Sequence, residues 1–184
     1  MSKGSSFDSL PWRTLILCLS CLFAAVPAKA QTPDTQQQVG WVSDVLGMRH
    51  FNGLRCPDMV GSLFRTKVLA ADADRMAGCV YSGRDGFRAI LRQHLSGTSS
   101  SSAADFLRAY KASGFAQVSL SGAAAGGISF KTRDWTSTTL CETLWRFSGK
   151  NADFTLWMAY ALPTQEGDVG PAIDAFTEIL NRQN

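Results

Sequence analysis

The sequence predicts an α+β domain in which an antiparallel sheet of about six or seven strands carries one inserted helix and one C-terminal helix. Three observations lead to this fold class. Apolar and polar residues alternate with a period of two over most of residues 54–162. Turn sequences such as Asp85-Gly86 and Gly149-Lys150-Asn151 separate successive alternating runs, as in hairpins. Two stretches with helical spacing interrupt and follow the strands, an order typical of α+β proteins.

The first group of strands is expected before residue 96. Pro57 has no N–H for a central ladder, so the segment that contains it is expected to be an edge strand. The Asp-Gly pair at 85–86 tolerates the positive φ of a tight hairpin. The expected strands are residues 54–57, 62–71, 77–82 and 87–95.

A helix is expected to separate the two groups of strands. Ser102 and Asp105 resemble the start of a capping box, and Gly114 stands where a helix ends in a left-handed residue. The second group of candidate strands is residues 117–121, 128–133, 140–148 and 153–162, so eight candidate segments supply the six or seven strands expected.

Residues 153–162 are apolar on both faces, which predicts a strand in the centre of a sheet covered by helices. Pro171 suits the first turn of a helix, and Ile173, Phe176 and Leu180 give that C-terminal helix an apolar stripe. The stripe is expected to dock on the sheet.

The N-terminus predicts export. Residues 1–30 resemble a signal peptide: Lys3 and Arg13 precede an apolar run, and Ala28-Lys29-Ala30 is a cleavage site, so cleavage is expected after Ala30. Residues 31–53 are expected to be a leader, in which 39–48 have either a short helix or an irregular path. Residues 54–184 are expected to form a single domain.

The charge balance excludes some partners. Removal of the signal peptide would leave 15 basic and 14 acidic residues, from 18 and 15 in the whole chain. This balance is too neutral for electrostatic capture of nucleic acid or anionic lipid. No second apolar run is long enough to span a bilayer.

Three cysteines, Cys56, Cys79 and Cys141, would remain after cleavage. One disulfide and one free thiol is the natural arrangement in an exported protein, and three pairings are possible. The short separation favours Cys56–Cys79, with Cys141 as the free thiol. Pairing of Cys141 with Cys79 is the alternative.

The sequence contains no recognisable catalytic motif. His50 and His94 are the two histidines, no Gly-x-Ser-x-Gly elbow is present, and His94 alternates with two arginines on what should be a solvated face. The cysteines and histidines lack zinc-site spacing, so neither a metal nor a cofactor is predicted. Cys141 is expected to be buried and inert, although a nucleophilic or redox role is the rival hypothesis.

A surface for a partner or small ligand is the remaining candidate site. Arginine and tryptophan concentrate binding energy at interfaces. Trp145 and Trp157 lie in apolar-rich strands and are expected in the core, whereas Trp135 is expected to be exposed. The candidate surface comprises Arg88, Arg92, His94, Lys131, Arg133 and Trp135.

The order of elements resembles the Mog1/PsbP-like class of small sheet-and-helix proteins. Cys56-Pro57 and Gly78-Cys79-Val80-Tyr81 also resemble segments of exported proteobacterial domains of unknown function. The first resemblance implies binding to another protein, and neither implies a catalytic residue. The sequence is therefore interpreted as a periplasmic or secreted, non-enzymatic domain that binds an envelope protein or a small ligand. The alternative is a thiol-dependent enzyme or redox protein that uses Cys141.

Overall fold

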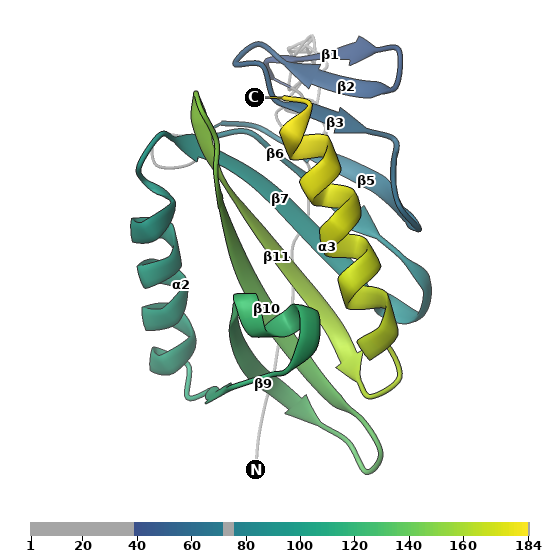
Figure 1. The fold of residues 1–184 in the computed structure, drawn as a ribbon, viewed down its shortest axis with the longest axis vertical. Helices are drawn as coiled ribbons and strands as arrows, with labels where there is room; N and C mark the ends of the chain where they lie inside the picture. The colour runs from purple at the N-terminus through teal and green to yellow at the C-terminus, as the bar shows by residue number, and fades with distance from the viewer. Residues whose placement is uncertain (1–38, 72–75, 184) are drawn as a thin grey trace, which may run out of the picture. The chain divides into compact units, whose positions relative to one another are not determined.

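Eight strands form the main sheet, in the order β4-β5-β6-β7-β11-β10-β9-β8, and every neighbouring pair is antiparallel (Figure 1). The computed structural model describes residues 39–71 and 76–183, so the predicted signal peptide lies outside the described residues. The strands are β4 (Met59–Val60), β5 (Leu63–Leu69), β6 (Gly78–Ser82), β7 (Arg88–Leu95), β8 (Ala116–Val118), β9 (Ile128–Asp134), β10 (Thr139–Ser148) and β11 (Ala152–Leu162).

A second, three-stranded sheet precedes the main one. Its strands are β1 (Trp41–Asp44), β2 (Gly47–His50) and β3 (Arg55–Pro57), in that order. The predicted α+β class is confirmed, with more strands than the six or seven expected. All eight candidate segments contain a strand, and three further strands come from the N-terminal hairpin and the two-residue β4. These three are too short or too irregular in polarity to give a strand pattern.

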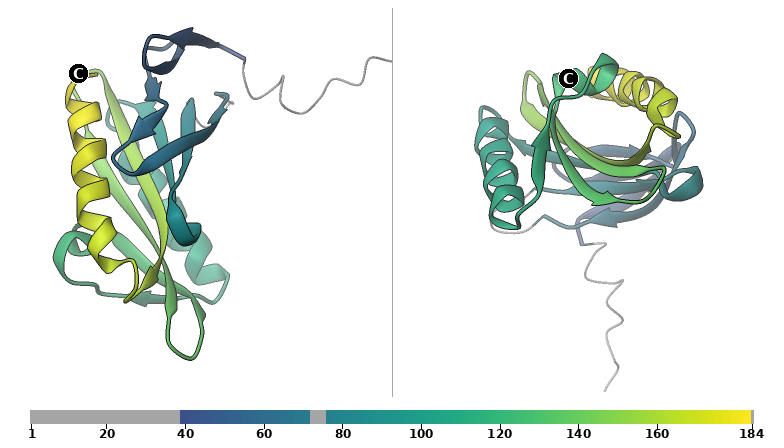
Figure 2. Two further views of the ribbon diagram at one scale, coloured as in Figure 1. Left: turned by 90° about the vertical axis from the view of Figure 1, so that its right-hand side faces the viewer. Right: turned by 90° about the horizontal axis from the view of Figure 1, so that it is seen from below.

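β11 occupies the centre of the main sheet, between β7 and β10, as its sequence predicts. It is also almost entirely buried. Both of its faces are apolar because a helix packs on each side of the sheet. The α3 helix (Glu166–Asn181) lies on the inner side of the curled sheet (Figure 2). There Phe176 meets Tyr81 edge to face. The α2 helix (Ser99–Ala112) lies on the outer side, where Phe106 and Tyr110 contact Phe130 of β9.

Residues 39–48 contain neither the short helix nor the irregular path expected for them. The segment is the β1–β2 hairpin, with Trp41 opposite His50 and Asp44 opposite Gly47. Gly47 has a φ of +154°, and a Cβ there would lie 2.3 Å from the Cys56 carbonyl oxygen, so only glycine fits. The apolar side chains that suggested a helix are exposed, Val45 by 95% and Leu46 by 71%. The hairpin pairs with β3 and therefore adds to the domain that was expected to begin at residue 54.

Both helices begin earlier than their sequences predict. α3 starts at Glu166, which places Pro171 inside the helix. The buried Gln165 anchors this start: its side chain accepts from the Ala161 N–H at 2.7 Å and donates to the Arg84 carbonyl oxygen at 3.2 Å. α2 starts at Ser99, whose N–H donates to Asp153 at 3.1 Å. The contacts with Arg84 and Asp153 come from distant segments, which local capping signals cannot reveal.

Candidate functional site

The strand register gathers a basic patch on the outer face of the main sheet. Arg88, Ile90 and Arg92 alternate along β7 and so point to one side, the side on which His94 meets α2. Ile90 pairs with Val80 of β6, which pairs with Lys67 of β5. We call these five residues the open face, because α2 packs instead on β9, β10 and β11.

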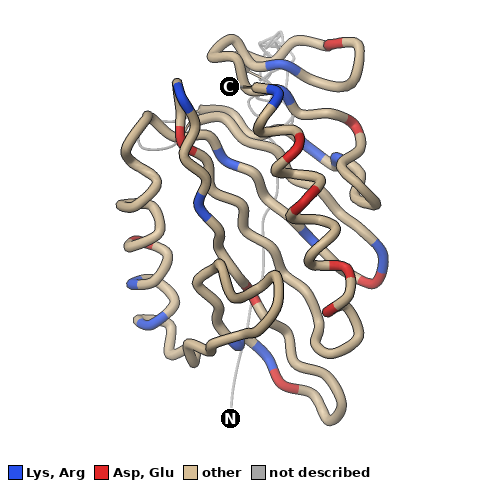
Figure 3. Tube along the Cα trace, in the orientation of Figure 1, with Lys and Arg blue, Asp and Glu red and all other residues tan. Residues whose placement is uncertain are grey.

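The charges of the open face have one sign. Lys67 and Arg88 are exposed, and Ile90 and Arg92 are partly buried. No aspartate or glutamate occurs in β5, β6 or β7. α3, on the other side of the sheet, carries four acidic residues (Figure 3): Glu166, Asp168, Asp174 and Glu178. The two faces of the sheet therefore have opposite electrostatic character.

The backbone fixes the position of Arg92. Its side chain lies over Gly78 of β6, where an added Cβ would approach the Arg92 Cδ to 2.9 Å. The guanidinium Nη1 donates to the Met76 carbonyl oxygen at 2.9 Å. Because Gly78 has no side chain, the Arg92 side chain can lie across β6 and reach the Met76 carbonyl oxygen.

The cations of the open face are widely spaced. Arg88 and Arg92 are four residues apart on one strand, which is roughly 13 Å at 3.3 Å per residue. Lys67 lies two strands away from Ile90, roughly 10 Å at about 4.8 Å per strand. These separations exceed the reach of a single small anion and suit an extended acidic surface around an apolar centre.

His94 does not belong to the exposed surface, contrary to expectation. It is 7% exposed, because α2 covers it. One ring nitrogen, Nε2, lies 2.8 Å from the Thr155 hydroxyl, and Nδ1 lies 3.1 Å from the Ser102 hydroxyl of α2. Alternation along β7 alone predicts exposure, and the covering helix lies beyond the range of that pattern. Burial, reinforced by the Arg92 charge and opposed by Asp153, lowers the pKa of His94 below its ordinary value of 6.5.

The lowered pKa predicts that stability falls with acidification. Below about pH 6.5 His94 binds a proton in the unfolded state more readily than in the folded state. Protonation therefore stabilises the unfolded state relative to the folded one. The melting temperature should therefore fall from pH 7.5 towards about pH 5. His94→Gln should flatten this pH dependence, as measured by thermal denaturation across the pH range. Equal pH dependence in both proteins would contradict the assignment.

The other predicted surface residues lie at a separate site. Lys131, Trp135 and Cys141 line a pocket of about 480 Å3, which we call the end pocket, at the inner face beside the β9–β10 turn. The Arg133 guanidinium lies 5.5 Å from the centre of the Trp135 ring, and Trp135 is 48% exposed. Lys131 Nζ lies 3.0 Å from Asp134, which balances its charge. The sequence-predicted surface is thus divided between the open face, the end pocket and a buried histidine.

Cys141 is a buried free cysteine. Burial raises the pKa of its thiol, an effect that Lys131 opposes and Asp134 reinforces. The pairing of Cys141 with Tyr160 places it on the inner side of the sheet, whereas His94 faces α2 on the outer side. The sheet therefore separates this thiol from His94, and the two cannot form a nucleophile and base pair.

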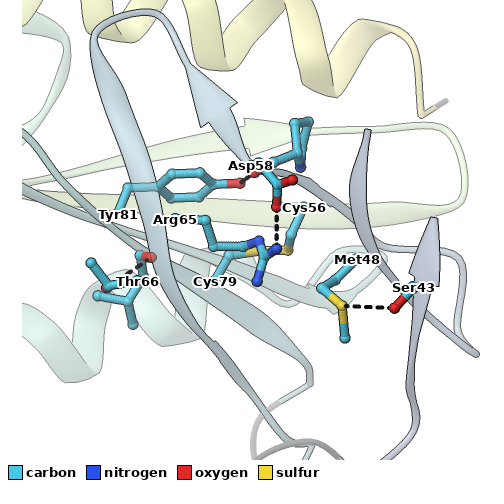
Figure 4. A network of polar contacts seen from close by, with 10 residues as sticks. Ser43, Met48, Cys56, Asp58, Arg65, Thr66, Cys79 and Tyr81 are labelled. Carbon is cyan, nitrogen blue, oxygen red and sulfur yellow. Dashed lines mark hydrogen bonds and ion pairs between the residues drawn. A yellow bond between two sulfur atoms is a disulfide. The ribbon is translucent and has the colours of Figure 1, made fainter. Parts of the chain in front are cut away.

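Cys56 and Cys79 form a disulfide, which confirms the favoured pairing. It joins β3 of the small sheet to β6 of the main sheet (Figure 4). The Tyr81 hydroxyl donates to the Pro57 carbonyl oxygen at 3.1 Å close by. Asp58 and Arg65 form an ion pair across the same junction. These contacts fasten the small sheet to the main one.

Sequence reasoning missed Lys67 as a member of the basic surface. A register irregularity between Arg65 and Lys67 changes the alternation of β5, so Phe64 and Lys67 both align with outer-face residues of β6. The sequence of β5 gives no signal for this bulge. Trp145 is buried as expected, and Trp157 is partly buried with its indole N–H 3.2 Å from Glu142.

Residues 39–71 and 76–183 contain no group of three or more His, Cys, Asp or Glu side chains able to hold a metal ion. Within the same residues, no helix is both long and apolar enough to cross a bilayer. Comparisons with family models, with curated proteins and with solved structures give no match for this chain.

Proposed function

We propose that this protein is an exported, non-enzymatic binding domain that docks an acidic protein of the cell envelope on its open face. The observation that carries the proposal is a sheet face on which three cations surround the partly buried Ile90, with no carboxylate in its three strands. Complementary charge steers association and selects partners. The Cys56–Cys79 disulfide is compatible with the oxidising compartment that the predicted signal peptide, cleaved after Ala30, would reach.

The proposal includes membership of a Mog1/PsbP-like class. Two helices and an antiparallel sheet support it, whereas the eight-stranded main sheet and the additional small sheet exceed the expected strand number. The implied mode of action is binding to another protein, which agrees with an open sheet face.

Neutralisation of the open face tests the proposal. The variant Lys67→Gln/Arg88→Gln/Arg92→Gln should bind its envelope partner at least tenfold more weakly, because exposed charge contacts contribute roughly 0.2–1 kcal/mol each and interface arginines often more. The immobilised chain would capture proteins from envelope extract, and the captured partner would be titrated at two salt concentrations. Wild-type affinity should fall with salt more steeply than that of the variant.

A matched control comes from α2, where Arg108→Gln/Lys111→Gln removes two exposed cations on another element. This control should retain wild-type affinity. An equal loss of affinity in both variants would show that binding depends on net charge and not on the open face, and would contradict the proposal. Binding to anionic phospholipid vesicles in place of an acidic protein would also contradict it.

The end pocket gives the rival function some structural support, because Cys141 lines it beside Lys131. A redox or nucleophilic thiol requires a lowered pKa, whereas burial raises the pKa of Cys141. Labelling of the native, oxidised protein with a maleimide should therefore be slow and should become fast on unfolding. Rapid labelling of the folded protein at mildly acidic pH would favour the thiol-dependent function, and Cys141→Ala would identify the labelled site.

A further inference from the structure

A second pocket lies at the other end of β11 from the end pocket and is lined by carboxamide side chains. Its volume is about 190 Å3, and Asn52, Gln93, Asn151 and Gln183 contribute to its wall together with Phe154. We call it the amide pocket. Gln93 pairs with Phe154 in the sheet, whereas the other three residues come from the β2–β3 loop, the β10–β11 turn and the C-terminal end. Four separate segments of the chain therefore converge on one small polar cavity.

Two polar atoms of the amide pocket lack hydrogen-bond partners among the described residues. Gln93 is 7% exposed, and its Oε1 acceptor is buried and unpaired. The Nδ2 donor of Asn52 is likewise buried and unpaired. Buried polar groups are almost always hydrogen-bonded, and an unpaired one costs free energy of folding. Residues with a buried unpaired acceptor and a buried unpaired donor thus line the same cavity, which makes it a candidate site for a molecule with complementary groups.

The neighbouring contacts hold these groups in place. Asn52 Oδ1 accepts from the Leu54 N–H at 3.3 Å, which orients the amide and leaves Nδ2 unpaired. The Gln183 amide is occupied by the β3 backbone, since it accepts from the Arg55 N–H at 3.0 Å and donates to the Arg55 carbonyl oxygen at 3.1 Å. Gln183 thus forms a rigid wall, whereas Asn52 and Gln93 supply the free donor and the free acceptor.

We infer that the amide pocket binds a neutral small molecule that presents a hydrogen-bond donor beside an acceptor. The residues that line it include no charged side chain, so an ion would find no counter-charge. The Phe154 ring supplies an apolar wall, as in most small-molecule sites, where a few placed polar groups fix orientation. Two chemical sources have this pattern: a secondary amide, such as the acetamido group of an amino sugar, and the vicinal hydroxyls of a neutral sugar.

Three probes distinguish these sources: N-methylacetamide, N-acetylglucosamine and glucose. The oxidised chain, purified from the periplasm of a host that processes it, would be titrated with each probe while the side-chain amide NMR signals of Asn52 and Gln93 are followed. Shifts with N-methylacetamide and N-acetylglucosamine, but not with glucose, would show that the pocket binds the secondary amide. Shifts with N-acetylglucosamine and glucose, but not with N-methylacetamide, would show that it binds the vicinal hydroxyls. The inference is overturned if no probe at millimolar concentration moves these signals, because the pocket would then hold only water.

Two variants remove the groups one at a time. Asn52→Asp retains the oxygen that bonds Leu54 and loses the Nδ2 donor, and Gln93→Leu loses the buried acceptor with little change in volume. Each should weaken probe binding at least tenfold. Gln117→Leu, an exposed position on β8, is the matched control and should bind as the wild type does. Equal weakening in all three variants, or none in the first two, would overturn the assignment. Affinity for the acidic envelope partner is an independent readout, because Lys67, Arg88 and Arg92 lie on the other face of the sheet.

Discussion

Replacement of both Cys56 and Cys79 by alanine is expected to lower the free energy of unfolding by about 3 kcal/mol. The disulfide closes a loop with a sequence separation of 23, and its Cα atoms are 6.2 Å apart, within the usual range. Both sulfurs are fully buried, so the substitution also removes core contacts. Chemical denaturation of the oxidised wild type and of the double variant would measure the difference.

Reduction gives an independent check on this prediction. Wild-type protein treated with a reductant should approach the stability of the double variant, and the double variant itself should not respond. Cys141→Ala is the control, because it removes a buried thiol without removing a cross-link, and reduction should destabilise it as much as the wild type. An oxidised wild type no more stable than the double variant would show that the small sheet stays docked without the cross-link.

The disulfide could be predicted because its two cysteines lie close together in the sequence. Cys56 and Cys79 are separated by a short segment that returns on itself through β5. The long alternating strands were predictable for the same reason: β7, β10 and β11 each bury one or both faces over eight or more residues. Period-two alternation reports burial reliably over such lengths.

The N-terminal hairpin was not predictable because the apolar residues that suggested a helix are exposed, although Trp41 is buried. Val42 and Val45 lie at helical spacing, yet they are 52% and 95% exposed. Hydrophobic periodicity assumes that apolar side chains face a core, and that assumption fails here. The informative residues were Gly40 and Gly47, with φ of +83° and +154°, which allow tight turns that other residues resist.

The candidate surfaces could not be predicted from the sequence because the exposure of their residues depends on tertiary structure. Arg88, Arg92 and His94 share one face of β7, but α2 covers only the last of them. Which part of a sheet face a helix covers depends on connections between distant segments, and the sequence pattern of one strand contains none of that information. The same limit applies to the amide pocket, whose four carboxamides are far apart in the sequence.

The basic open face and the acidic α3 lie on opposite sides of the sheet, so an acidic partner should approach from the side of the open face. An acidic protein that meets the open face also avoids α3, whose exposed residues Glu166, Asp168 and Asp174 would repel it. Repulsion from the wrong face contributes to specificity as much as attraction to the correct one. A nearly neutral net charge therefore does not exclude electrostatic recognition, because the two signs are separated across the sheet.

Truncation of Phe176 to alanine is expected to cost about 3–5 kcal/mol, the typical range for a buried phenylalanine. Phe176 is fully buried on α3 and packs edge to face on Tyr81 with ring centres 5.3 Å apart. Tyr81 in turn donates to the Pro57 carbonyl oxygen at 3.1 Å, so loss of the phenyl ring should loosen both the helix and the junction with β3. Denaturant unfolding monitored by circular dichroism would measure the loss.

A neighbouring substitution on α3 separates packing from helix propensity. Thr177→Ala replaces the next residue, which is only partly covered, and alanine favours helix, so its effect should stay within about 0.5 kcal/mol. If Phe176→Ala were equally mild, α3 would not depend on the inner face of the sheet for its position. A large loss for Phe176→Ala alone, with a faster exchange of amide hydrogens in β3 than in β10, would show that the aromatic contact transmits stability from the helix to the small sheet.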